Sequence, residues 1–474
     1  HPTTRGAPGV EMKTAIFQHG ITTDRSATIP LGSSMVAKAF AAGTDLTVIA
    51  IDQPLHGVSG VSTAEQEALA IQLLTVAETI NPTDIDGISD DEQDIIDAVV
   101  ADLFAPSIVS QIDPACPFID ISGVGGIDQA VTDTLAGNCD GLGFDAALGV
   151  EPSVAVAGAK TLERTINNAG STIAGLAATA NERHFDFTSA GAGVAPTQTD
   201  YTDPNNANSS GSMFINLTSF LTSRDNLRQQ IVDLLTLRRS IADMDLNPTA
   251  ADGDDLDATD VYFFGHSLGT VNGIPFVSVA NTSATTADDI VAANFLTPGG
   301  GILGLIENSP SLSTPVLAGL AGSGLEQDNN SFHSYTNILQ ASLDATDAIS
   351  FVQDFSSTAL NTPVLFSEVI GDTTIPNDPA TSPLGNAFPA HLSGTEPLAK
   401  LSGSATIAAT AGTVALGQSI VRYTQGTHGT PAFPSTGTNE EKAVFAEMVG
   451  HGVSMLLSNG TAITVSATGA TVIQ

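Results

Sequence analysis

The chain has 474 residues, of which 42% are hydrophobic, enough for one large globular domain with insertions or for two domains. Lysine and arginine together number 14 against 51 aspartate and glutamate residues, which gives a formal net charge of −37. Such a charge repels phosphate backbones and anionic headgroups at long range, so composition argues against a nucleic-acid partner.

Strand-like apolar runs alternate along the chain with helix-like segments, which predicts a mostly parallel, doubly wound α/β sheet with helices on both faces. The runs lie at 14–18, 46–51, 261–264, 290–296, 364–370 and 419–424.

Roughly two hundred residues separate the second strand-like run from the third, far more than a crossover connection needs. We therefore predict an α/β core from residues 1–59 and 216–474. Residues 60–215 are predicted to be a cap subdomain inserted into the same domain, with helices at 64–78 and 90–104.

A helix after the insertion is predicted to lead into the strand at 261, with Ser223 as its N-cap. Its apolar stripe consists of Leu227, Ile231, Leu234, Leu235 and Ile241.

Two long interruptions of the later sheet, 297–350 and 378–417, are candidate lid segments. The tail is predicted to form a helix at 439–457 and a final strand at 462–467.

Cys116 and Cys139 are the only two cysteines, and they lie in turn-rich surroundings without metal-type spacing. A disulfide in an oxidising compartment is favoured over two unrelated buried thiols. No apolar stretch approaches the roughly 18 residues that a membrane span needs. We therefore expect a secreted protein or one at a bacterial cell surface.

The pentapeptide "GHSLG" at 265–269 follows the strand-like run "VYFF" and precedes a segment that can form a helix. In a strand–turn–helix of this G-x-S-x-G type the serine occupies a strained turn, and the two glycines allow close packing of strand and helix. This context predicts Ser267 as a nucleophile near a helix N-terminus, where a developing anion is stabilised.

A serine nucleophile needs a base, and the base needs an orienting acid, in the chain order Ser, Asp or Glu, His. His428 follows the strand at 419–424 in a glycine-flanked loop, and it is a better candidate than His391 or His451. Asp372, in the turn after the strand at 364–370, is the predicted acid. Asp378 is the alternative, and Asp372 could instead be only a turn former.

An acyl-transfer oxyanion needs two converging N–H donors. The N–H of Leu268 follows the nucleophile, and that of Ile21 lies in the loop after the first strand. Three histidines, His19, His56 and His266, are predicted to line or support the substrate site, and His19 is interpreted as loop-fixing rather than as a base.

Six motifs together resemble the α/β-hydrolase superfamily, and within it bacterial lipases and carboxylesterases of the surface-exposed or virulence-factor type. They are "QHGIT", "IDQPLHG", "RDNLRQQIVDLL", "GHSLG", "GDTTIP" and "THGTP". The resemblance implies the Ser267–Asp372–His428 triad and the Ile21 and Leu268 oxyanion donors. It does not cover the 60–215 insertion in detail, and the sheet begins at the strand that the family counts as third.

The acidic stretch 243–255 resembles a calcium-binding loop, with Asp243, Asp245, Asn247 and Asp254 at ligand-like positions. Pro248 stands where such a loop requires glycine, so a solvated acidic turn is favoured over bound calcium. We predict no metal site and no cofactor.

The sequence thus predicts a secreted serine ester hydrolase for hydrophobic acyl esters, because 302–320 is apolar and an insertion covers the sheet. Its partners would be an ester or lipid substrate and a lipid–water interface. A lysophospholipase or a polyester depolymerase with the same triad stays open, as does an inactive surface-binding protein.

Overall fold

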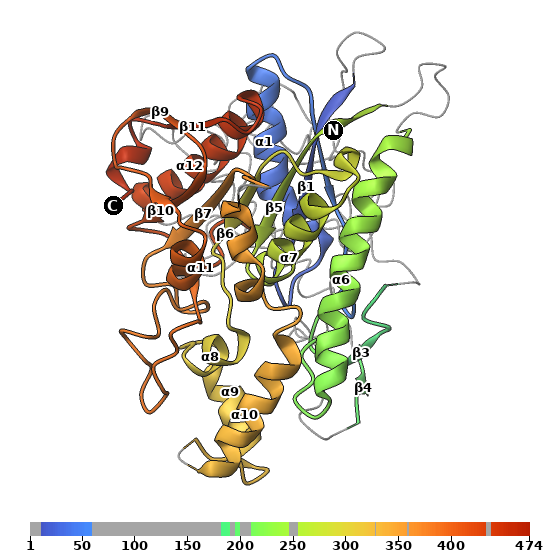
Figure 1. The fold of residues 1–474 in the computed structure, drawn as a ribbon, viewed down its shortest axis with the longest axis vertical. Helices are drawn as coiled ribbons and strands as arrows, with labels where there is room; N and C mark the ends of the chain where they lie inside the picture. Colours follow the sequence, from blue (N-terminus) through green and yellow to red (C-terminus); the bar gives the residue numbers. More distant parts are fainter. Residues whose placement is uncertain are drawn as a thin grey trace, which may run out of the picture.

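A computed structural model describes residues 11–58, 182–189, 195–199, 210–245, 255–327, 329–357, 360–432 and 438–474. Its centre is a seven-stranded sheet of order β2-β1-β5-β6-β7-β10-β8, in which every neighbouring pair is parallel (Figure 1). The strands are β1 (Met12–Gln18), β2 (Leu46–Ala50), β5 (Leu256–His266), β6 (Ala293–Leu296), β7 (Val364–Val369), β8 (Ala405–Thr406) and β10 (Gln418–Tyr423).

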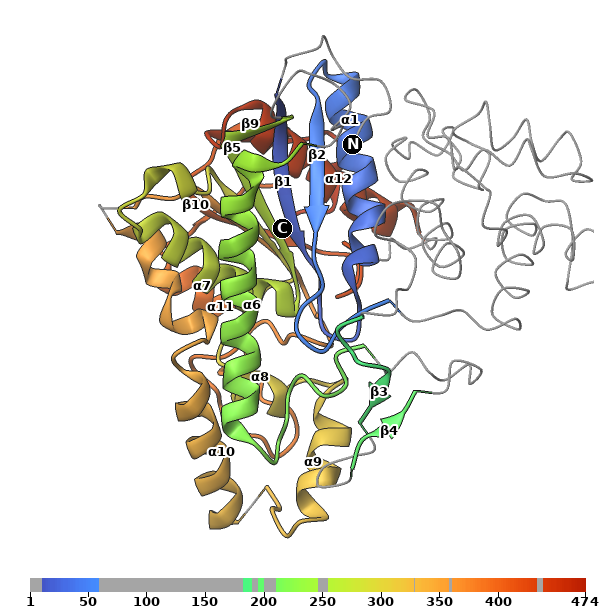
Figure 2. The ribbon, with the colours of Figure 1, turned by 90° about the vertical axis from the view of Figure 1, so that its right-hand side faces the viewer.

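Helices cover both faces of the sheet, as the alternation of the sequence predicts (Figure 2). One face packs against α1 (Ile29–Ala41) and α12 (Asn439–Leu457), and the other against α6 (Phe220–Ser240), α7 (Leu268–Thr282) and α11 (Thr395–Leu401). Strand β5 contributes side chains to the hydrophobic core on each face of the sheet. Tyr262 and Phe264 pack on the face with α1 and α12, and Phe263 packs on the face with α6, α7 and α11.

Helix α6 has its apolar stripe where the sequence predicts it, but the predicted N-cap is wrong. Ser219 occupies the N-cap position and Ser223 lies inside the helix. There the Ser223 Oγ donates to the Asn216 carbonyl and accepts from the Asn216 N–H. The added first turn is stabilised by Phe220, whose ring packs edge-on at 5.1 Å against Tyr335.

Part of the candidate lid at 378–417 belongs to the core, and a lid role for the segment stays a prediction. Residues 395–417 contain α11, β8 and β9 (Gly412–Ala415), and Leu398, Ile407 and Leu416 are core residues. The predicted final strand is β11 (Ala462–Val465), which pairs antiparallel with β9 rather than extending the main sheet.

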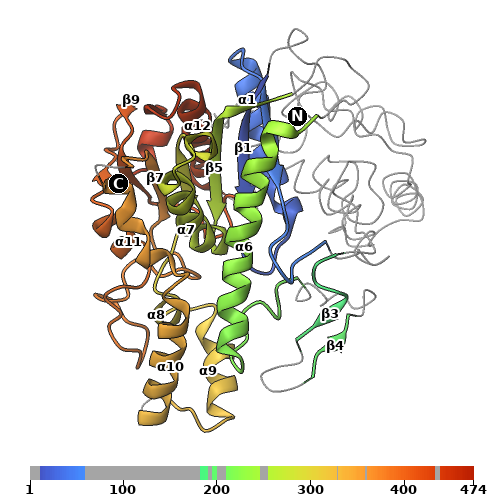
Figure 3. The ribbon, with the colours of Figure 1, turned by 45° about the vertical axis from the view of Figure 1, so that its right-hand side comes forward.

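The candidate lid at 297–350 contains α8 (Ile302–Glu307), α9 (Ser313–Ala321) and α10 (Asn330–Leu343). These helices lie beyond the carboxyl ends of the parallel strands (Figures 1 and 3). Loops at that end of a parallel sheet are where α/β proteins bind ligands.

Of the predicted insertion, 60–215, the structure describes parts of the C-terminal end, which include the short paired strands β3 (Phe187–Thr188) and β4 (Thr197–Gln198). The helices predicted at 64–78 and 90–104, both cysteines, and residues 246–254 of the acidic stretch lie outside the described residues. Within the described part, no helix has the length and apolar character to cross a membrane.

The turn between β5 and α7 is packed so closely that its glycines cannot carry side chains. A Cβ on Gly269 would lie 2.1 Å from the Gln18 carbonyl oxygen, and one on Gly265 would lie 2.6 Å from the Gly269 oxygen. Helix α7 therefore approaches the ends of β1 and β5 backbone to backbone, which is the packing that the two glycines of the pentapeptide predict.

The Gly269→Ala variant should lose roughly 1–3 kcal/mol of unfolding free energy, because its methyl group overlaps rigid backbone. Gly319→Ala is the control, since Gly319 lies in α9 with nothing within 4 Å of its Cβ position. There alanine should stabilise the protein slightly. Urea unfolding measures both, and equal effects would contradict the packing account.

Candidate active site

Ser267 occupies the turn between β5 and α7 with φ 56° and ψ −120°. A positive φ is unfavourable for a residue with a Cβ and is found where the surrounding structure enforces it, often at functional sites. The Ser267 N–H donates to the Leu296 carbonyl at 3.1 Å, and its own carbonyl accepts the Thr270 N–H at 2.8 Å. Both bonds fix the serine at the N-terminus of α7.

Asp372 and His428 follow β7 and β10, two adjacent parallel strands, and their side chains meet. The His428 Nδ1 lies 2.7 Å from the Asp372 Oδ2. Because a carboxylate only accepts, Nδ1 carries the proton in this bond, which leaves Nε2 of a neutral ring as a proton acceptor.

Asp372 is both a turn former and the partner of His428. Its other oxygen, Oδ1, accepts the N–H groups of Thr374 and Ile375 at 2.7 and 3.0 Å. Asp378 instead binds the N–H of Ala380 and the side chain of Thr381, within its own turn.

The residue before Ser267, His266, links the end of β5 to the loop that carries His428. Its Nε2 lies 2.9 Å from the His428 carbonyl oxygen, and the two rings are 5.3 Å apart. Among the described contacts none joins Ser267 Oγ to His428 Nε2 by a hydrogen bond. Such bonds are often long before a substrate binds.

The loop after β1 lies directly against the serine. A Cβ built on Gly20 would be 3.0 Å from the Ser267 Cβ and 3.4 Å from its Oγ. Ile21, the next residue, packs in one apolar cluster with Leu268. The Leu268 N–H is at the start of α7, where helical N–H groups have no intrahelical acceptor. Ile21 and Leu268, the two residues predicted to supply oxyanion donors, therefore lie on segments adjoining Ser267, and the role of their N–H groups stays a prediction.

The three histidines predicted to line the substrate site are buried, with exposed fractions of 0% for His19, 0% for His56 and 3% for His266. His56 donates from Nδ1 to the Pro54 carbonyl and packs between the rings of His19 and Phe214. The burial and contacts of these histidines favour the interpretation that they support the loops of the site over the interpretation that they touch a substrate.

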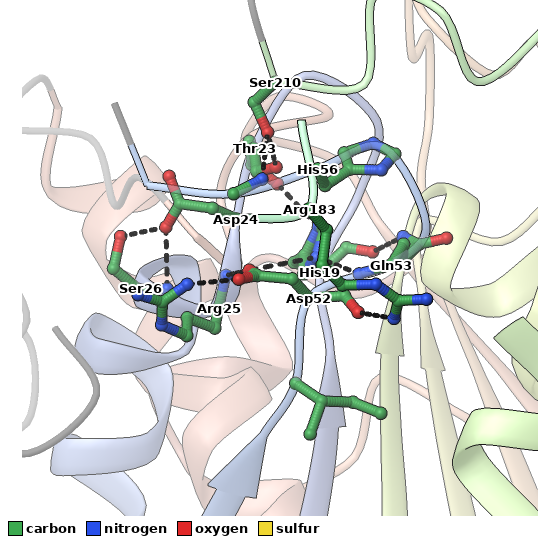
Figure 4. Close-up of polar contacts among 12 residues, drawn as sticks. His19, Thr23, Asp24, Arg25, Ser26, Asp52, Gln53, His56, Arg183 and Ser210 are labelled. Carbon is green, nitrogen blue, oxygen red and sulfur yellow. Dashed lines mark hydrogen bonds and ion pairs between the residues drawn. The ribbon is translucent and has the colours of Figure 1, made fainter. Parts of the chain in front are cut away.

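Sequence reasoning missed an ion-pair network behind the site (Figure 4). The Arg25 guanidinium contacts the Asp52 carboxylate and donates two hydrogen bonds of 2.8 Å to Glu182. The Arg25 N–H also donates to Asp52 at 2.6 Å, and Arg183 donates to the Asp52 carbonyl at 2.7 Å. The last part of the insertion is thus tied to the loops after β1 and β2.

The charges of this network perturb one another. Burial lowers the pKa of Arg25, but its hydrogen bond to Glu182 and the charges of Asp52 and Glu182 outweigh it, so the pKa lies above the ordinary value. Burial raises the pKa of Asp52, against the opposing charge of Arg25. The one feature of the sequence that could have indicated this ion-pair network is the position of Arg25 and Asp52 after two adjacent strands.

Within the described ranges, no three His, Cys, Asp or Glu side chains are grouped so as to hold a metal ion. Most of the acidic stretch 243–255 lies outside those ranges, so its assignment as a solvated turn without calcium stays a prediction.

Comparison with known proteins gave no match to a family model, to a curated protein or to a solved structure. A function for this protein is therefore inferred from the arrangement of Ser267, Asp372 and His428.

Glu182→Gln should lower the unfolding free energy by roughly 3 kcal/mol, because it leaves part of a buried charge cluster unpaired. Asp225→Asn is the matched control: it breaks the exposed Arg224–Asp225 pair on α6. The control should leave stability unchanged, because exposed ion pairs contribute little. If both variants unfold at the same denaturant concentration, the network does not anchor the insertion.

The pKa of His266 is lowered to about 3, first by burial and then by the charge of His428. The unfolded chain therefore binds a proton at His266 below about pH 6.5 while the folded chain stays neutral there, so acid removes stability. We expect the unfolding free energy of the wild type, measured against that of His266→Gln, to fall as the pH drops from 6.5 towards 3.

A pH-independent difference between the wild type and His266→Gln would show that the folded chain protonates His266 as readily as the unfolded one.

Proposed function

We propose that this protein is a serine ester hydrolase of the α/β-hydrolase type. The observation that carries the proposal is the strained strand–helix turn of Ser267 at the end of β5, in the same sheet whose strands β7 and β10 precede the hydrogen-bonded pair of Asp372 and His428. The order Ser, Asp, His along the chain supports it, as does the position of each residue directly after a strand of one parallel sheet.

In the proposed reaction the Ser267 Oγ attacks the ester carbonyl carbon while His428 Nε2 takes the hydroxyl proton. The alcohol leaves with that proton, and the acyl group stays bonded to Ser267. Water, deprotonated by the same nitrogen, then releases the acid and restores the serine. Asp372 holds the imidazole in the tautomer that can accept at Nε2 and stabilises its positive charge.

The negative oxygen of the tetrahedral intermediate would accept hydrogen bonds from the Ile21 and Leu268 N–H groups. Support comes from the contact between Gly20 and Ser267 and from the place of Leu268 at the N-terminus of α7. Prepositioned donors of this kind are usually the largest single contribution to such catalysis, and the helix dipole adds to them.

A hydrophobic acyl group is the substrate portion that best fits the surroundings of Ser267. Ile21 and Leu268 belong to an apolar cluster whose other members come from α6, α7, α8, α10 and the end of the insertion. Its buried members besides Leu268 are Phe214, Leu227, Val271, Ile302, Leu339 and Leu343.

Large exposed apolar side chains on neighbouring segments support action at a lipid–water interface. They are Phe185, Phe187, Leu221, Ile338, Phe388 and Leu392. The net charge of −37 favours an uncharged or zwitterionic lipid surface over an anionic one. Secretion or a cell-surface location remains part of the proposal and rests on the cysteine pattern.

Steady-state hydrolysis of p-nitrophenyl esters from acetate to palmitate tests the proposal. Ser267→Ala should lower kcat by roughly 10³-fold or more, and Asp372→Asn by about 10⁴-fold because the imidazole loses its orientation. The matched controls Asp378→Asn and His391→Gln remove the alternative acid and an exposed histidine, and both should retain wild-type kcat. Activity that persists in Ser267→Ala would overturn the proposal.

A further inference from the structure

We propose that His19 is a positioning residue that turns the Gly20–Ile21 peptide so that the Ile21 N–H faces the reacting oxygen. The inference rests on the proposed function and assigns a role to a buried side chain that the mechanism itself does not use. It starts from the hydrogen bonds around the His19 ring (Figure 4).

The two nitrogens of His19 have different partners. Nε2 lies 3.1 Å from the Gln53 backbone nitrogen, whose N–H can only donate, so Nε2 is the acceptor. Nδ1 lies 2.8 Å from the Gly20 carbonyl oxygen, which can only accept, so Nδ1 carries the proton. His19 is therefore a neutral ring in the Nδ1–H tautomer, which suits its complete burial.

The Gly20 carbonyl also accepts from Thr23 Oγ1 at 2.9 Å, so two donors hold it. In a trans peptide the carbonyl and the following N–H point in opposite directions. The Ile21 N–H is therefore directed away from His19, and Gly20 itself is the residue in contact with Ser267. Thr22, next along, has φ 63°, so this loop is held in a strained conformation.

Gln53 keeps the His19 ring in place. Its Nε2 donates to the His19 carbonyl at 2.6 Å, and its Oε1 accepts from Asn272 of α7 at 2.7 Å. The loop after β1, the loop after β2 and the helix that carries the nucleophile are thus joined through a buried polar chain. Small movements of His19 would change the direction of the Ile21 N–H.

Two pairs of variants test the inference in the full-length protein. His19→Leu removes the hydrogen bonds at both ring nitrogens, whereas His19→Asn retains an N–H close to the Nδ1 position. Thr23→Val removes the second donor to Gly20, and Thr23→Ser keeps it. We expect His19→Leu to lower kcat by about 10²-fold to 10³-fold with little change in KM, as for loss of one oxyanion donor. His19→Asn should recover most of that loss, and Thr23→Val should lose more than Thr23→Ser.

A boronic acid that forms a tetrahedral anion on Ser267 gives the second readout. Its affinity should fall by the same factor as kcat/KM in His19→Leu and Thr23→Val, because it needs the same N–H. Unchanged boronate affinity in folded Thr23→Val and His19→Leu would overturn the inference, as would a His19→Asn variant as impaired as His19→Leu. A wild type that neither hydrolyses esters nor binds the boronate would instead refute the proposed function.

Discussion

The close contact between the β5–α7 turn and the end of β1 is the constraint on which the site depends. The Gly269 backbone approaches the Gln18 and His19 carbonyls too closely for any side chain, and Gly20 contacts Ser267 in return. One steric fit thus fixes both the strained serine and the loop that carries the Ile21 N–H. Because protein interiors are as dense as organic crystals, such a contact leaves little freedom for either segment.

The rest of the site is assembled by strand order. Parallel strands end at the same edge of the sheet, so residues after β5, β7 and β10 converge although they are far apart in the chain. The His266 ring then contacts the backbone carbonyl of His428, and Asp372 holds the His428 ring through its Nδ1. Behind these residues, Arg25, Asp52 and Glu182 connect the same edge to the end of the insertion.

The sequence could predict the parts that depend on local pattern. Long apolar runs gave six strands of the sheet, and helix 439–457 was predicted with the bounds that the structure shows. Strand β8 was missed because it has only two residues, both exposed. The N-cap of α6 was misplaced because Ser219 and Ser223 are equally good cap residues, and a tertiary contact of Phe220 decides between them.

The ion-pair network could not be predicted, because Arg25 and Glu182 lie 157 positions apart and no local pattern links them. The hydrogen-bond partners of the buried histidines could not be predicted either. The local sequence of a histidine beside a glycine does not indicate whether its ring touches a substrate or a backbone carbonyl. Only the partners of each nitrogen separate His19 and His266 from His428.

In the proposed function, Ser267 is an activated nucleophile. An alkyl fluorophosphonate followed by intact-mass and peptide analysis tests this directly, because the reagent bonds covalently to a serine that a neighbouring histidine deprotonates. We expect one adduct per chain, on the peptide that contains Ser267, and much slower labelling of His428→Ala. No adduct, or an adduct on another residue, would contradict it.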